Sequence, residues 1–88
     1  MAKKTDVRIV ILQRGWVFVG RFKKVGDQCS LENARNVRKW GTTKGLGEIA
    51  ENGPTKETVL DSCPTVRFHE QTVIASIDCA EEKWLSHL

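Results

Sequence analysis

The stretch VRIVILQRGWVFVGRF, residues 7–22, decides the fold of this 88-residue chain. Its first part, Val7–Leu12, is rich in β-branched side chains and apolar on both faces, which is typical of a buried strand. Gly15 then permits a turn, and residues 16–22 alternate so that the aromatic rings share one face. Gly20, inside this second strand, indicates a bulge or bend that lets a sheet curl. The stretch therefore predicts two antiparallel strands in a curved sheet.

Residues 28–40 fit two different patterns. Cys29, Leu31 and Val37 share one parity, which favours a long strand. Apolar residues at every third position from Leu31 to Trp40 favour a helix instead, although the asparagines among them weaken it. We favour the strand, which completes a meander of three consecutive antiparallel strands.

The second half of the chain contains shorter elements. Residues 46–51 can form a helical turn that ends before Gly53-Pro54, and residues 58–60 are extended. Residues 65–68 and 72–77 have the pattern of a final hairpin around Glu70-Gln71. Residues 80–88 can form a short amphipathic helix, or equally a loose tail.

About five strands with short connections carry more apolar faces than one open sheet can hide. We therefore predict a mainly-β fold in which residues 1–88 form one domain. Its architecture is a small, strongly bent, five-stranded antiparallel barrel, followed by a short C-terminal helix or tail.

The composition excludes several classes of protein. The longest apolar run is four residues, Ile9 to Leu12, which is too short for a transmembrane helix. The N-terminus has no apolar signal core, so we expect a cytoplasmic protein without membrane contact. Its three cysteines, Cys29, Cys63 and Cys79, form no CxxC motif and fit a reducing compartment. With only two histidines in the chain, we expect no metal site and no cofactor.

Charge is distributed unevenly along the chain. Residues 1–44 hold eleven basic and three acidic side chains, a balance of +8, whereas residues 45–88 hold three and eight, a balance of −5. This polarity suggests an anionic partner for the basic half, or head-to-tail association of copies. The alternative is that the two halves interleave in the fold and their charges mix.

The basic half interleaves cations with aromatic rings, which is the chemistry of nucleic-acid binding. Cations neutralise phosphates, and an exposed indole can stack on a base. The alternative for Trp16 and Trp40 is that they anchor the core. The candidate nucleic-acid-binding residues are Arg14, Arg21, Lys23, Lys24, Arg35, Arg38, Lys39, Trp40 and Lys44.

The glycine-rich segment 41–47 departs from both phosphate-binding motifs, the P-loop and GxGxxG. Its backbone amides can still form a small anion nest, and a plain flexible connector is the alternative. The residues of this candidate anion loop are Thr42, Thr43, Lys44 and Gly45. No catalytic signature occurs, and Cys63 near His69 lacks an orienting acid, so we expect no enzymatic activity.

Several segments resemble a family of short, uncharacterised proteins of bacteria and their phages. They are residues 8–22, Asn33-Ala34, the segment WGTTKGLGEIA at 40–50, and Gly53-Pro54-Thr55. The resemblance implies a phage or prophage context and no mechanism.

The order of elements is also similar to the Sm-like barrels (Sm, LSm and Hfq proteins), a bent five-stranded architecture of SH3-like type that forms rings on RNA. The similarity rests on Val19-Gly-Arg-Phe22, Gly26-Asp27, Leu31-Glu-Asn-Ala34 and a late strand pair, 66–69 and 73–78. Sm-like chains carry an asparagine four residues after the aspartate, where this chain has Leu31.

Together these patterns predict a non-enzymatic small binding protein of phage type, which binds RNA or DNA through its basic half. The alternative is a phage accessory protein that binds a host protein, or sequesters a nucleotide signal, to counter host defence. A third possibility is an assembly role as a homo-oligomer. In each case we expect it in the cytoplasm of the host cell.

Overall fold

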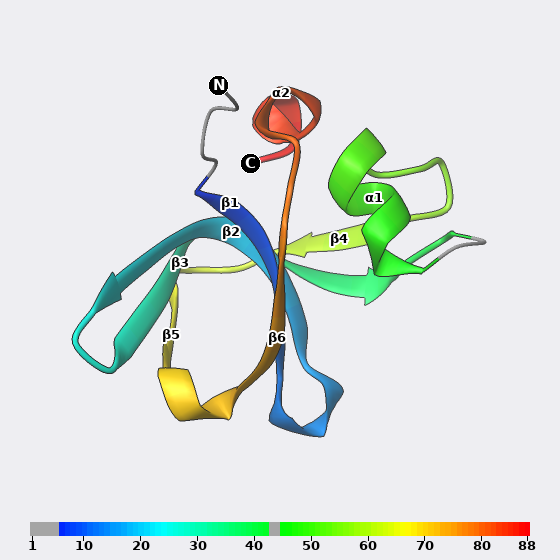
Figure 1. The fold of residues 1–88 in the computed structure, drawn as a ribbon. Helices are drawn as coiled ribbons and strands as arrows, with labels where there is room; N and C mark the ends of the chain where they lie inside the picture. The colour runs from blue at the N-terminus through cyan, green and yellow to red at the C-terminus, as the bar shows by residue number, and fades with distance from the viewer. Residues whose placement is uncertain (1–5, 43–44) are drawn as a thin grey trace.

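A computed structural model describes residues 6–42 and 45–88 of the chain (Figure 1). The strands are β1 (Val7–Leu12), β2 (Val17–Val25), β3 (Gln28–Lys39), β4 (Val59–Ser62), β5 (Val66–His69) and β6 (Val73–Asp78). The α-helices are α1 (Leu46–Asn52) and α2 (Glu81–Trp84), and the 3-10 turns are η1 (Gln13–Gly15), η2 (Glu70–Thr72) and η3 (Leu85–His87).

The strands form one antiparallel sheet in the order β4-β3-β2-β1-β6. The predicted meander β1-β2-β3 is confirmed, and the ambiguous segment after the Gly26-Asp27 turn is a strand as far as Lys39. The long strand β3 pairs with β2 on one side. On its other side it pairs with β5 over residues 28–31 and with β4 over residues 35–39.

The predicted closed barrel of five strands is wrong, because the sheet has six strands and is not closed. The predicted hairpin of residues 65–68 and 72–77 is wrong as well, since β5 pairs with β3 while β6 pairs with β1. The turn η2 crosses between these two partners and is fixed to the β2–β3 turn, where the Glu70 amide donates to the Asp27 carbonyl at 2.9 Å. The strands β5 and β6 thus pair with different strands, and β6 at one end of the sheet does not pair with β4 or β5 at the other.

Gly20 marks a bulge, as its place in the strand predicted. Val19 lies opposite Arg35 but Arg21 lies opposite Glu32, so β3 contains an extra residue here. A Cβ atom on Gly20 would lie 2.9 Å from the Glu32 carbonyl oxygen, too close for any residue but glycine.

The bulge also moves the side chains of β3 from one face to the other. Leu31 and Val37 share parity in the sequence, yet they are buried in two different clusters. The extra residue lies at Asn33, whose φ of 54° is in the left-handed region. The alternation of apolar residues therefore predicted correctly that this segment is a strand. It placed Leu31 and Val37 on one face, whereas the bulge puts them on opposite faces.

The two faces of the sheet carry two cores. On one face, Val7, Ile9 and Val19 pack under α1 and α2, which both lie on this side of the sheet (Figure 1). On the other face, Val10, Leu31 and Phe68 pack inside the curl of the sheet. Helix α2 confirms the predicted C-terminal helix, and its Trp84 is completely buried in the first core.

Helix α1 ends at Gly53, as the Gly-Pro pair predicted. Its carbonyl at Ile49 accepts hydrogen bonds from the Gly53 amide at 2.8 Å and from Nε1 of Trp84 at 3.0 Å. The indole of α2 therefore holds the end of α1 on the sheet. None of the helices among the described residues is long and apolar enough to cross a membrane.

Candidate nucleic-acid interface

Ion pairs join the basic and the acidic halves of the chain in the fold. Lys24 Nζ lies 2.5 Å from a carboxylate oxygen of Glu70, and Arg38 Nε lies 2.8 Å from one of Asp61. Both acids come from the acidic half, because β4, β5 and η2 lie against β3 and its turn. Arg8–Asp78 at 3.5 Å and Lys39–Glu57 at 3.7 Å also join the two halves, whereas Arg21–Asp6 at 3.0 Å and Lys23–Glu32 at 3.2 Å lie within the basic half. The alternative reading of the sequence, that the two halves interleave, describes this arrangement better than a single basic surface does.

The predicted basic residues of β3 face opposite sides of the sheet. Arg35 shares the helix-covered face with Val37, where its Nε donates to the His87 carbonyl at 2.9 Å and its guanidinium also donates to Ser62. Arg38 reaches Asp61, which lies opposite Asn36 in the register and therefore on the other face. The structure thus separates Arg35 from Arg38.

An exposed pair of stacked aromatic rings lies on the same face as Arg38. The rings of Trp16 and Phe18 are 6.2 Å apart between centroids and nearly parallel, with 9° between their planes. Phe18 packs against the second core, whereas the side chain of Trp16 is 56% exposed. Trp16 and Phe18, which we term the aromatic platform, therefore present a flat indole to solvent on an anchored base.

Two arginines of the candidate list lie on segments that adjoin the aromatic platform. Arg14 lies in η1, two residues before Trp16, and is exposed without an ion-pair partner among the described residues. Phe18 lies opposite Asn36 of β3, and Arg38 follows two residues later on that strand, at an irregularity in its pairing with β4. The sequence and the register thus place Arg14 and Arg38 on the two segments next to the platform.

Trp16 was not among the candidate site residues, since its role as a core anchor was the competing interpretation. The indole that anchors the core is that of Trp84, which is fully buried, whereas Trp40 is 44% exposed. One feature of the sequence is consistent with an exposed Trp16. It directly follows the turn at Gly15, so it lies at the end of a strand, where side chains are less often buried in the core of a small domain.

The candidate anion loop is only partly described. Thr43 and Lys44 lie outside the described residues. The hydroxyl of Thr42 is buried and has no hydrogen-bond partner among the described residues, and Gly45 precedes α1 with a φ of 85°. The carbonyl of the neighbouring Gly41 accepts the Thr55 hydroxyl at 2.7 Å, which ties this loop to the segment that follows α1.

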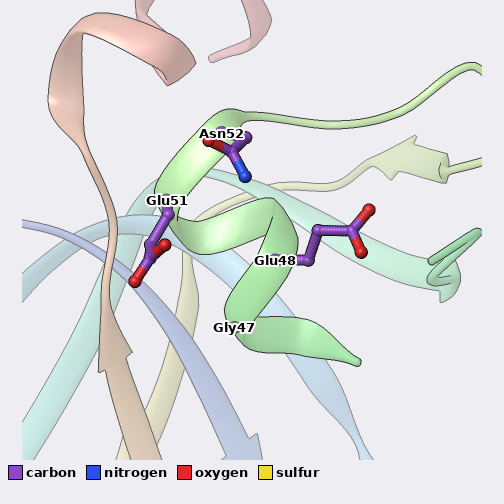
Figure 2. A pocket seen from close by; sticks show the side chains of 4 residues that line it. All are labelled: Gly47, Glu48, Glu51 and Asn52. Atoms are coloured by element: carbon purple, nitrogen blue, oxygen red, sulfur yellow. The ribbon is translucent and has the colours of Figure 1, made fainter. Parts of the chain in front are cut away.

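A shallow pocket of about 450 Å³ lies along α1, lined by Gly47, Glu48, Glu51 and Asn52. Figure 2 shows the Glu48 and Glu51 side chains pointing to different sides of the helix. They do not converge as a pair of carboxylates for acid–base chemistry would have to. Within residues 6–42 and 45–88, no group of three or more His, Cys, Asp or Glu side chains is placed to hold a metal ion.

The three cysteines are free thiols. Burial raises the pKa of Cys29 and Cys63, and it raises the pKa of Cys79 to about 12. At neutral pH all three therefore stay protonated, which is the less nucleophilic form of a cysteine side chain.

The comparisons with known proteins place the chain in a family but assign no activity. No curated protein matches the sequence. A family model described as a domain of unknown function, DUF6948, matches residues 4–86. This match agrees with the resemblance to an uncharacterised family, and because it covers nearly the whole chain, the protein belongs to the DUF6948 domain family.

Proposed function

We propose that this protein is a non-enzymatic binding protein that holds single-stranded nucleic acid, RNA or DNA, on its aromatic platform. The observation that carries the proposal is the parallel stack of Trp16 on Phe18, with the indole 56% exposed. A monomeric small domain gains stability by burying such a ring, so an exposed and pre-oriented indole is better explained by a ligand with a flat face. Nucleobases have that face, and one base stacked on an aromatic side chain contributes about 1–3 kcal/mol.

The charges around the platform support a small phosphate footprint. Arg14 is unpaired among the described residues, and Arg38 can exchange Asp61 for a phosphate oxygen. The other described cations on the candidate list are held by carboxylates or, for Arg35, by a carbonyl and a hydroxyl. We therefore expect about two phosphate contacts, which corresponds to a slope of log K against log salt of roughly −1 to −2.

Fluorescence anisotropy with labelled oligo(dT) and oligo(U) at low salt tests the proposal. The change Trp16→Ala removes the stacking surface, and we expect it to weaken binding by about 5- to 150-fold. Trp40→Ala is the matched control, because it removes another exposed indole and leaves the stack of Trp16 on Phe18 in place. Equal affinities of the Trp16→Ala variant and the unchanged protein would refute the platform as the binding site.

The arginines have a test of their own. Arg14→Gln and Arg38→Gln are each expected to lower the steepness of the salt dependence by about 0.7, the contribution of one phosphate on a single strand. Lys56→Gln serves as the control for loss of one exposed charge, since Lys56 is exposed in the connection between α1 and β4 and belongs to neither segment that adjoins the platform. If Lys56→Gln changed the slope as much as either arginine variant, the electrostatic footprint would not be centred on the platform.

A host protein is the second candidate partner, and the edge strand β6 favours it. Among the described strands β6 pairs with β1 alone, and Ile74 on it is 64% exposed. Such an edge has unpaired backbone groups that can add an extended strand from another chain. Replacement of Ser76 by proline would remove one backbone N–H donor from this edge. It would abolish the binding of a partner that adds a strand to β6, and it would leave oligonucleotide binding unchanged.

The wider biological setting is also a proposal. A phage or prophage origin rests on the sequence resemblance at residues 40–50, and a cytoplasmic location is supported by the three free thiols. A homo-oligomeric ring of Sm-like type would use the open ends of the sheet. Light scattering with and without total RNA tests assembly, and a mass that stays monomeric under both conditions would exclude it.

A further inference from the structure

A cleft of about 400 Å³ lies beside η2, on the face of the sheet that carries the second core, and the proposed nucleic-acid site makes no use of it. Its wall on one side is η2 with the start of β6, and on the other side it is formed by β1, β2 and the beginning of β3. We call it the η2 cleft. The residues that matter here are Arg8, Phe22, Lys24, Glu70, Gln71 and Val73. Its volume is in the range of pockets that hold small organic molecules.

Arg8 provides a largely enclosed cation on the wall of the cleft. The carbon of its guanidinium lies 4.6 Å from the centroid of the Phe22 ring, and its side chain is only 24% exposed. Its Nε is buried and donates no hydrogen bond among the described residues. The neighbouring carboxylate of Asp78 lies 3.5 Å away, but Asp78 does not line the cleft and its side chain is 73% exposed. Solvent screens the attraction within such an exposed pair, so an anion in the cleft can compete for the guanidinium.

The aromatic ring of Phe22 holds the guanidinium of Arg8 in place on this face of the sheet. In the register, Arg8 lies opposite Gly20 on β2, where the bulge of β3 takes the place of a side chain. A planar guanidinium stacked on Phe22 is also fixed in orientation, which favours two-point binding of a carboxylate.

The other side chains of the cleft define the rest of the ligand. Lys24 and Glu70 form an ion pair of 2.5 Å at the rim and cancel each other. Asp78, the partner of Arg8, does not line the cleft, so the lining itself holds one cation more than it holds anions. Phe22 and Val73 contribute apolar surface, and Gln71 stands exposed at the edge. This combination fits a molecule with one negative charge and a compact apolar body.

We propose that the η2 cleft binds a small organic carboxylate, with its carboxylate on the Arg8 guanidinium and its apolar body between Phe22 and Val73. The site is separate from the aromatic platform, so ligand binding here is independent of whether the protein binds nucleic acid.

Titration of the ¹⁵N-labelled protein with benzoate, followed by NMR, tests this proposal, and benzamide is the neutral probe of the same shape. Benzoate is expected to shift the amides of Arg8, Val73 and Ser76 in a saturable manner and to bind about tenfold more tightly than benzamide. Arg8→Gln should remove this preference. Equal binding of the two probes, or no saturable shift of these amides with benzoate, would overturn the proposal.

Arg8 lies on a central strand, so its replacement also affects the stability of the fold. Gln71 is exposed, and its variants test the site without this effect. Gln71→Lys adds a cation at the rim and should strengthen benzoate binding several-fold, whereas Gln71→Glu should weaken it by a similar factor. Neither change should alter the affinity for benzamide. Identical benzoate affinities in the two Gln71 variants would contradict the site, whatever the behaviour of the Arg8 variant.

Discussion

Two glycines with a left-handed backbone show how the same conformation can carry very different constraints. Gly15 and Gly41 both have φ in the left-handed region, at 79° and 65°. A Cβ atom at Gly15 would meet nothing within 4 Å, whereas at Gly41 it would lie 2.3 Å from the Glu57 carbonyl carbon. The identity of Gly41 is thus dictated by a neighbouring chain segment, and that of Gly15 by backbone conformation alone.

The change Gly15→Ala should therefore cost about 1 kcal/mol of unfolding free energy, the strain of a positive φ. Gly41→Ala carries the same strain plus an overlap with backbone that cannot rotate away, and we expect it to cost at least about 3 kcal/mol. Urea unfolding of both variants measures the difference. Similar losses at the two positions would contradict the close approach of residues 41 and 57.

Cys79 predicts a dependence of stability on alkaline pH. Burial raises its pKa to about 12 from the ordinary value of 9.0, so the unfolded chain loses the thiol proton at a lower pH than the folded chain. The stabilisation is complete below pH 9 and declines as the pH rises toward 12, by up to about 1.4 kcal/mol per pH unit. Cys79→Ala should flatten this decline in urea titrations between pH 8 and pH 10. If stability declined equally in the Cys79→Ala variant, titratable groups other than Cys79 would cause the decline.

At the scale of elements, the packing of α1 and α2 depends on one indole. Trp84 is fully buried and its Nε1 bonds the Ile49 carbonyl at 3.0 Å. Trp84→Phe loses this hydrogen bond and part of the ring, and should cost about 1–3 kcal/mol; Trp84→Ala should cost about 3–5 kcal/mol.

Trp40→Phe is the control for these variants, because the Trp40 side chain is 44% exposed and its replacement should cost under about 0.5 kcal/mol. Chemical unfolding followed by circular dichroism reports all three values. A Trp84→Ala variant as stable as the Trp40→Phe variant would mean that α2 does not contribute to the first core.

Local patterns in the sequence predicted the strands, the turn and the end of α1, but they did not predict which strands pair. The strand Val7–Leu12, the turn at Gly15 and the stop at Gly53 are each determined by neighbours in the sequence, and the structure has all three. The pairing of β5 with β3 is determined by a contact between residues about forty positions apart. Proximity in the sequence favoured a hairpin there, while the long strand β3 has room along its edge for both β4 and β5.

At the scale of the whole molecule, the two oppositely charged halves of the chain contribute neighbouring strands to one sheet. The acidic strands lie beside the basic strands, so a balance of +8 and −5 along the chain becomes a set of ion pairs in space. A count of charges along the sequence cannot predict which strands pair, and so cannot predict which charges lie side by side. Of the described cations on the candidate list, Arg14 alone has no ion-pair or side-chain hydrogen-bond partner among the described residues, while the others contact acids or, for Arg35, a carbonyl and a hydroxyl.

The ion pair of Arg38 and Asp61 is a direct probe of the contact between the two halves. Its side chains are 68% and 46% exposed, so the pair should contribute about 0.3–1 kcal/mol. Arg38→Glu should destabilise the protein by like-charge repulsion, and adding Asp61→Arg should restore most of the loss. A double variant no more stable than Arg38→Glu would show that β3 and β4 do not hold these residues together.

The central claim, that nucleic acid stacks on Trp16, is tested most directly through the three indole N–H signals of the ¹⁵N-labelled protein. Trp16 lies on the platform, Trp40 is exposed elsewhere and Trp84 is buried. On addition of a short oligo(dT) or oligo(U), we predict that the Trp16 signal shifts or broadens well before the other two. An unmoved Trp16 signal, under conditions where the oligonucleotide is bound, would contradict the account.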